Sequence, residues 1–241
     1  MITVAPQKWT PMPTTAGPFT SAERLDPQEM VVLHRVFRRE IPILADLVED
    51  APGDRRRTAV LADHLDLVLG ALGEHHEGED ALLWPKLRER AVPGDNVVAR
   101  MADQHEAIAG ALAAATDLSH SWRTRGDRDT ALLLAEALRA LDRHAAAHMD
   151  DEEEHLLPLM AEHITAREWS EVGERGRRSV PKAKLLIFLG AILEDATAQE
   201  RQQFLAHMPA PARLLWRTLG IRLYKRTTAR VRRTNAVAPQ A

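Results

Sequence analysis

The sequence contains one short phrase twice, in which a glutamate follows a histidine by four residues and a proline follows it by ten. The first copy is His75, Glu79 and Pro85, and the second copy begins with His148 and Glu152. Residues four apart lie one above the other on a single face of an α-helix. Each phrase therefore offers one imidazole and one carboxylate in the same direction, and both groups bind metal ions. Two such helices that face each other would form a metal site.

Two isolated histidines, His34 and His105, extend this set, since each lies on an apolar stripe of helical spacing. A lone histidine on such a stripe is more often a core residue than a ligand. A buried glutamate, however, is costly unless it is paired or bound to metal, and here two glutamates recur in register, each beside a histidine. We therefore predict six metal ligands. They are His34, His75, Glu79, His105, His148 and Glu152.

The predicted ligands are four imidazoles and two carboxylates, without sulfur, which suits iron, manganese or zinc better than copper(I), calcium or magnesium. Six protein ligands exceed what one ion with an open position needs. They suit two ions, each with two histidines, with the carboxylates bridging between them. Such a centre leaves room for a bridging oxygen and for dioxygen, peroxide or nitric oxide. If the six groups instead close the coordination shell, the metal only staples the helices.

The phrases HHEGEDALLWP, from His75, and HMDDEEEHLLP, from His148, resemble the hemerythrin-like (HHE cation-binding) family over residues 27 to about 163. The resemblance implies a four-helix bundle with two non-haem iron ions, joined by an oxo or hydroxo bridge and held by the six residues above. It implies binding of oxygen, nitric oxide or peroxide. Oxygen carriers of the family have a further histidine where this chain has Ala109. That difference favours sensing, storage or detoxification of peroxide or nitric oxide, and leaves open whether the protein is an enzyme.

The sequence leaves open whether two more histidines, His76 and His144, are metal ligands. His76 and Asp80 repeat the four-residue spacing one residue later, a rotation of about 100° on a helix. We interpret them as groups behind the ligands or at the surface, unless the register is shifted. His144 lies one turn before His148 and is a candidate for a seventh ligand or for a residue that positions one.

Four long segments with apolar residues at helical spacing must position these groups, and they begin near Asp26, Asp54, Asp95 and Asp127. Matching residues recur after about 72 positions, which pairs the first segment with the third and the second with the fourth. We predict an all-α protein, an antiparallel up-down-up-down four-helix bundle with a C-terminal helical extension. The expected division is an extended arm (1–25), the bundle (26–164) and an accessory helical tail (165–241). Pro85 and Pro158 should kink or end their helices just beyond the ligands.

Composition narrows the remaining classes of function. The chain has no cysteine, which excludes disulfides and thiolate metal sites, and its formal charge of −3 gives no global field for nucleic acid. The first residues lack a secretion signal and no apolar run approaches about 20 residues, so we expect a cytoplasmic protein without a transmembrane segment.

The tail differs from the rest of the chain in charge. Residues 209–233 hold eight Lys and Arg and no acidic residue, with apolar residues interleaved. We interpret this segment as an amphipathic helix docked on the bundle. An anionic membrane, a nucleic acid, a protein partner or a second copy of the chain remain alternatives as its target, and nothing specific in the sequence favours one of them.

Overall fold

The computed structural model describes residues 27–51, 53–91, 95–206 and 208–233. The predicted arm, residues 1–25, lies outside the described residues, as does the predicted capping residue Asp26. The described part is helical and contains no β-strand, which confirms the all-α prediction. No helix in it is long and apolar enough to cross a membrane.

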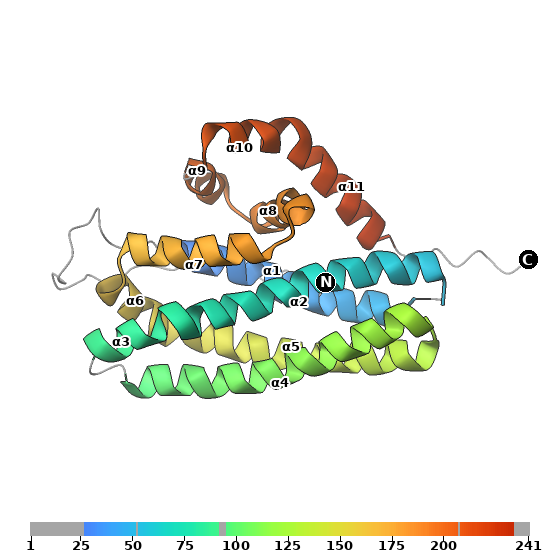
Figure 1. Ribbon diagram of the computed structural model, residues 1–241, viewed down its shortest axis with the longest axis horizontal. Coiled ribbons are helices and arrows are strands. Elements are labelled where there is room, and N and C mark those ends of the chain that lie inside the picture. Colours follow the sequence, from blue (N-terminus) through green and yellow to red (C-terminus); the bar gives the residue numbers. More distant parts are fainter. Residues whose placement is uncertain (1–26, 52, 92–94, 207, 234–241) are drawn as a thin grey trace, which may run out of the picture.

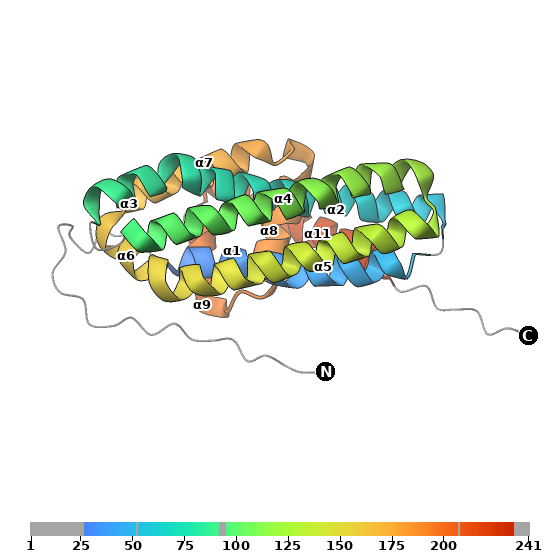
Figure 2. The ribbon, with the colours of Figure 1, turned by 90° about the horizontal axis from the view of Figure 1, so that it is seen from below.

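Four long helices run side by side through the body of the molecule (Figures 1 and 2). They are α1 (Gln28–Glu49), α2 (Arg55–Leu82), α4 (Asp95–Arg125) and α5 (Arg128–Asp151). The helix α5 packs on α1 and α4, and α2 packs on α4 and α1. Two predicted starts carry their cap, because Asp54 accepts a hydrogen bond from the Arg56 amide and Asp127 from that of Thr130.

The leucine stripes of these helices meet in a core of fully buried side chains, among them Leu65, Leu72, Leu138 and Leu141. This core is closed by apolar residues at the far end of the bundle, including Trp122. A second apolar cluster, which contains Met30, Leu83 and Met101, lies at the other end. Along the helices, the candidate ligands lie between these two clusters.

The prolines end their helices as predicted. The helix α2 stops at Leu82, and α3 (Trp84–Arg90) begins with Pro85 in its first turn. After α5 the backbone widens into the π-helix η2 (Glu152–Leu156), and α6 (Leu157–His163) has Pro158 in its first turn. A proline lacks the backbone N–H that a continuous helix needs, but is tolerated in the first turn. The helix α2 thus ends shortly after Glu79, and the change from η2 to α6 comes shortly after Glu152.

The tail forms a second layer over α1 and α2 (Figure 1). Its elements are α7 (Ala166–Ser179), the 3₁₀ turn η3 (Lys182–Lys184), α8 (Leu185–Glu194), α9 (Ala198–Ala206), α10 (Ala210–Leu215), the π-helix η4 (Trp216–Gly220) and α11 (Ile221–Val231). The helix α7 lies along α2, and its N-terminus has a capping box of Thr165 and Glu168. The helix α8 covers α1, where Val32 and Val36 are buried against Ile192 and its neighbours.

Candidate metal centre

The six predicted ligands are all buried, with exposed fractions of 6% or less. The helices α1 and α4 contribute one histidine each, α2 contributes His75 and Glu79, and the junction of α5 and η2 contributes His148 and Glu152. Within the described residues, these six and His76 form two groups, and in each group one ligand atom per residue lies within 4.8 Å of the others. The first group is His34, His75 and Glu152, and the second is His76, Glu79, His105 and His148.

His76 is the residue that sequence reasoning misjudged. Its side chain is only 6% exposed, and its ring centroid lies 4.4 Å from that of His105 and 5.0 Å from that of His148. The surface interpretation was wrong because α2 packs on α1 on one side and on α4 on the other. Two adjacent residues of α2 can therefore both point inward, His75 towards His34 and His76 towards His105. The signal in the sequence that could have indicated this was the pair of adjacent histidines, His75 and His76.

Outward-facing nitrogens of three imidazoles have partners that fix the position of the ring proton. His34 Nδ1 lies 2.8 Å from a Glu153 carboxylate oxygen, and His105 Nδ1 lies 2.8 Å from Asp80. A carboxylate only accepts, so each Nδ1 donates its hydrogen and the lone pair of a neutral ring is left on Nε2. Asp80 thus stands behind a predicted ligand, as the sequence indicated.

The third imidazole is oriented through an amide. His148 Nδ1 lies 3.1 Å from Gln104 Oε1, while Gln104 Nε2 donates to Asp151 at 2.9 Å. Arg100 holds the same Asp151 carboxylate through two hydrogen bonds of 2.6 and 2.7 Å. These hydrogen bonds fix the Gln104 amide with its oxygen towards the ring. His148 therefore donates from Nδ1 and directs its Nε2 lone pair inward.

The inward nitrogens lie in close pairs. His105 Nε2 is 3.2 Å from His148 Nε2, and His34 Nε2 is 3.2 Å from His75 Nε2. Two nitrogens bound at about 2.1 Å to one ion lie roughly 3.0 to 3.4 Å apart, for right-angled to tetrahedral coordination. His105 and His148 both donate outward from Nδ1, so their Nε2 atoms face each other. Two nitrogen acceptors this close to each other suit a cation between them, either a proton or a metal ion.

The two carboxylates connect the groups. Glu79 lies 3.2 Å from His75 Nδ1 and 3.5 Å from His105 Nε2, whereas Glu152 lies 3.2 Å from His34 Nε2 and 3.5 Å from His148 Nε2. None of their four oxygens accepts a hydrogen bond of good geometry, although all four are buried. Orphaned carboxylate oxygens among inward nitrogens are what a cation site requires, so the residues present fit a metal ion.

Burial and mutual charge shift the pKa values of these groups in a consistent way. Burial lowers the pKa values of His75 and His76 well below normal and that of His148 to about 4. Burial and the charge of Glu152 raise the pKa of Glu79 well above normal. The protein alone therefore holds too little positive charge for two ionised glutamates, and a metal ion would supply it.

His34 and Glu152 shift towards their charged forms. For His34, burial lowers the pKa, but the carboxylates of Glu152 and Glu153 outweigh it and raise the pKa. For Glu152, burial alone would raise the pKa, yet contact with His34 and the charges of the other histidines lower it to about 2.

Two other histidines of the described residues, His144 and His64, lie apart from both groups. His144 is exposed, so the structure does not bring it together with the ligands. His64 is 7% exposed and its Nε2 lies 2.9 Å from Glu40, with which it forms a buried pair.

A cleft of about 360 Å³ reaches the outer side of the second group. It is lined by His105 and its partner Asp80, together with Trp84 of α3 and Ala109 of α4. The Trp84 ring lies 5.4 Å from that of His105, and its buried Nε1 has no hydrogen-bond partner. The small side chain of Ala109 helps to leave this space open.

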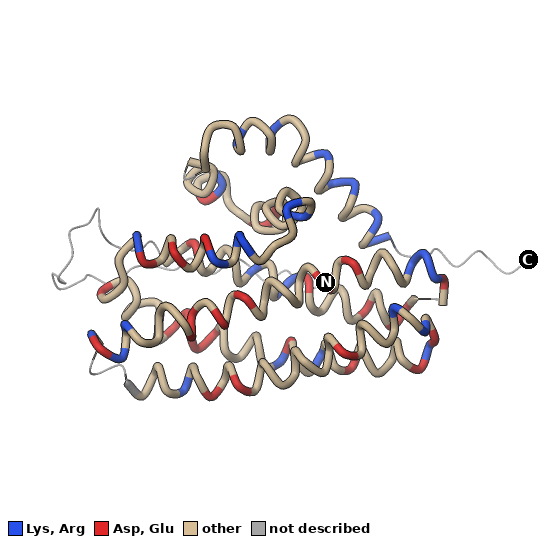
Figure 3. The backbone as a smooth tube through the Cα atoms, viewed as in Figure 1, with Lys and Arg blue, Asp and Glu red and all other residues tan. Residues whose placement is uncertain are grey.

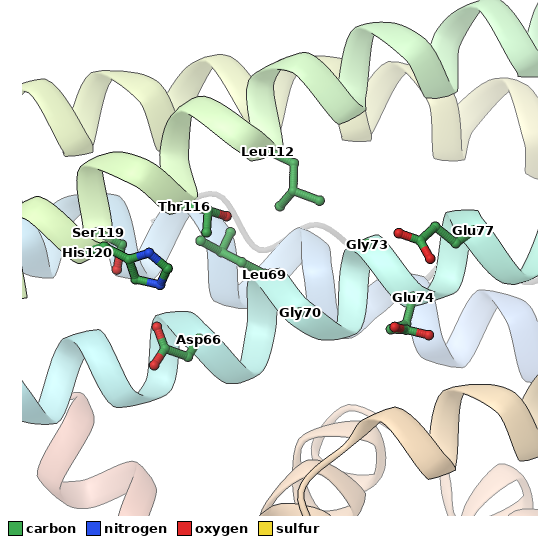
Figure 4. Close-up of a pocket in the computed structure, with 10 residues that line it drawn as sticks. All are labelled: Asp66, Leu69, Gly70, Gly73, Glu74, Glu77, Leu112, Thr116, Ser119 and His120. Carbon is green, nitrogen blue, oxygen red and sulfur yellow. The ribbon is translucent and has the colours of Figure 1, made fainter.

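A second hollow lies between α2 and α4 (Figure 4). It is lined by Gly70 and Gly73 of α2, by acidic residues such as Asp66, and by Thr116 and His120 of α4. It contains no member of either ligand group, and its Asp66 is already paired with Arg123 of α4 at 2.6 Å. We therefore do not assign the metal chemistry to it.

Comparison with known proteins identifies one family. The family model described as "Hemerythrin HHE cation binding domain" matches residues 27–160. No curated protein and no solved structure matches the chain. The matched segment covers more than half of the 241 residues, and it includes every residue of both ligand groups.

Proposed function

Because the chain belongs to the hemerythrin HHE cation-binding family, we propose that it is a non-haem di-iron protein that binds dioxygen, nitric oxide or peroxide. We further propose that α1, α2, α4 and α5 form the antiparallel four-helix bundle of that family around the two ions. The observation that carries the proposal is the set of orphaned, buried oxygens of Glu79 and Glu152 among inward-directed imidazole nitrogens.

The number of ions follows from how the carboxylates span the two groups. Each glutamate lies within 3.5 Å of a histidine of the first group and of a histidine of the second. We infer that one ion belongs to each group, with Glu79 and Glu152 bridging. His76 completes the second group as a seventh ligand. Nitrogen and oxygen ligands in this proportion suit iron, and two adjacent iron ions supply the redox chemistry that oxygen, peroxide and nitric oxide require.

The protein's own residues would then orient the ligands and control access. Glu153, Asp80 and Gln104 hold the ring protons on the outer nitrogens, which leaves the inner nitrogens free to bind. The cleft beside His105 gives a small molecule a route towards the second group. Because Ala109 replaces the further histidine of oxygen carriers, we favour sensing, storage or detoxification over reversible oxygen transport.

The metal content and the optical spectrum test this proposal directly. We expect two irons per chain, with oxo-bridge absorption that changes on reduction and on addition of air, peroxide or nitric oxide. One zinc per chain and no visible absorption would reject the di-iron centre. That result would favour the second candidate, a structural or regulatory bundle stapled by metal, which a closed shell of nitrogen and oxygen ligands would also suit.

The bridging role has its own test. Glu79→Ala and Glu152→Ala should each abolish loading of both ions, since each carboxylate is shared. Glu154→Ala is the matched control, because that side chain is 77% exposed and lies two residues beyond Glu152. Metal stoichiometry measured by mass spectrometry would contradict bridging if either single variant retained two ions.

A further inference from the structure

Four apolar side chains project from the outer face of α10, η4 and α11. Leu214 is 64% exposed, Leu215 47%, Leu219 51% and Ile221 38%. Among the described residues only one other large hydrophobic side chain is comparably exposed, Leu133 of α5 at 61%. We call these four residues the apolar patch. Their concentration in one short segment indicates a contact surface, since scattered single hydrophobic residues are the usual pattern.

A row of cations continues from the apolar patch along α11. Arg222, Lys225, Arg226 and Arg230 are all exposed, and their spacing puts them on one face of the helix. We call them the basic stripe. None of them forms an ion pair with a described residue, and the sequence contains no Asp or Glu after Glu200. Figure 3 accordingly shows α10 and α11 with blue residues and no red ones.

The opposite face of this segment is packed firmly, so the surface is preformed. Trp216 and Val231 are buried. The ring of Tyr224 lies so close to α8 that a Cβ atom on Gly190 would come within 2.2 Å of it. The Tyr224 hydroxyl also donates to Glu194 at 2.6 Å. The segment is thereby held as an arch that projects from the bundle (Figure 1).

We propose that the apolar patch and the basic stripe together bind the surface of a membrane that contains anionic phospholipids. Leucine side chains gain by entering the boundary between headgroups and acyl chains, while arginine and lysine meet the lipid phosphates. A nucleic acid would contact the basic stripe but would leave the apolar patch in water. An outward-projecting surface that combines both features fits a lipid bilayer better. The helix lies on the bilayer and does not span it.

Vesicle flotation with the full-length protein tests this proposal. We expect the protein to float with vesicles of phosphatidylglycerol and phosphatidylcholine, and to bind pure phosphatidylcholine much more weakly. Leu214→Ser with Leu219→Ser should reduce the partition coefficient roughly tenfold or more per leucine. Arg222→Gln with Arg226→Gln should reduce it about fivefold per cation at low salt.

Matched variants separate this surface from general charge and hydrophobicity. Leu133→Ser removes the comparably exposed leucine of α5, and Arg167→Gln with Arg178→Gln removes the same charge from α7; both should float as the wild type does. Circular dichroism checks that every variant is folded. Equal binding to neutral vesicles would overturn the proposal. So would unchanged flotation of the leucine variant together with competition by duplex DNA, which would indicate a polyanion site instead.

Discussion

His75 and His76 are neighbours in the sequence, but they face different groups of the candidate centre. The rotation of about 100° between successive residues of a helix usually separates a buried position from an exposed one. Here it separates two buried positions, because α2 is covered by other helices on both sides. The doubled histidine therefore supplies one imidazole to each group, and the second of them has a buried Nε2 without a partner.

His76→Ala should weaken the binding of one of two metal ions. The second group would keep Glu79, His105 and His148, whereas the first group would be unchanged. We expect the affinity for one ion to fall at least tenfold, measured by competition with a chelator. His144→Ala is the control, since that histidine is exposed. If both variants bound two ions with wild-type affinity, His76 would not be a ligand.

Asp80→Ala should lower metal affinity without removing a ligand. His105 Nδ1 would lose its acceptor, so the ring proton could move to Nε2 and compete with the metal ion. Loss of such an outer partner typically costs about 10- to 100-fold in affinity. Asp80→Asn keeps an acceptor oxygen and should show a smaller loss. The exposed Glu106→Gln on α4 is a charge-matched control, and ¹⁵N chemical shifts would report the tautomer of His105.

An equal loss of affinity in Asp80→Ala and Glu106→Gln would assign the effect to net charge. A wild-type tautomer and wild-type affinity in Asp80→Ala would show that the proton on His105 is set by something other than Asp80.

Among the helices, α1 carries the contact that ties the tail to the bundle. Glu40 of α1 is 2% exposed and accepts from His64 of α2 at 2.9 Å and from Arg232, just after α11, at 2.6 Å. Arg39 adds a third ion pair to the same carboxylate. A charge buried this deeply is stable only with its partners present, so this cluster makes the position of α11 depend on that of α1.

Acid should remove the stabilisation that Glu40 gives to this contact, because the pKa of its carboxyl is lower in the folded protein than in the unfolded chain. Burial alone would raise the pKa of Glu40, but His64, Arg39 and Arg232 outweigh it and lower the pKa from 4.5 to about 2. A lowered folded-state pKa means that the stabilisation is complete above about pH 4.5 and is lost as the pH falls towards 2. The shift corresponds to on the order of 3 kcal/mol.

We therefore expect the difference in unfolding free energy between the wild type and Glu40→Gln to shrink by that order between pH 6 and pH 2. Urea unfolding of the metal-free protein measures it. Glu89→Gln changes an exposed glutamate of α3 and should show no comparable trend. A pH-independent difference between Glu40→Gln and the wild type would contradict this role for Glu40.

The elements also show what sequence could predict. Apolar spacing and capping residues identified the long helices, and Pro85 and Pro158 identified where two of them end, because these signals are local. His76 was misjudged because its burial depends on which helices cover α2. The partnership of His148 with Gln104 and Asp151 joins two helices, and nothing in the local spacing indicates it. The packing of the tail on α1 could not be predicted from the sequence either. Apolar residues such as Val32 have the same spacing whichever element covers them.

On the scale of the whole molecule, the domain boundary is open to experiment. We propose that the metal-binding unit extends through α7 and ends near residue 180, beyond the predicted limit of 164. Arg90 of α3 forms two hydrogen bonds with Glu168, and Trp169 donates to Glu29 of α1. Val172 lies against Gly78, one residue before Glu79. The helix α7 thus closes the bundle beside the candidate centre.

A fragment of residues 26–180 should bind two ions and resist urea better than one of residues 26–164. Both contain all seven candidate ligands, so their difference reports the packing of α7. Metal stoichiometry and urea unfolding are the measurements. Equal stability of the two fragments would return the boundary to residue 164, and a folded 26–180 fragment without metal would show that the tail contributes to the centre.

Both fragments lose the cover over Val32 and Val36, which α8 and its neighbours bury in the full chain. Replacing both valines with glutamine should therefore act in opposite directions in the two contexts. In the 26–180 fragment it removes exposed apolar surface and should increase solubility. In the full chain it places polar groups in an apolar contact, at a cost of about 1 to 3 kcal/mol for each unpaired amide. Unchanged stability of the full-length variant would mean that α8 does not hold the tail on α1 in solution.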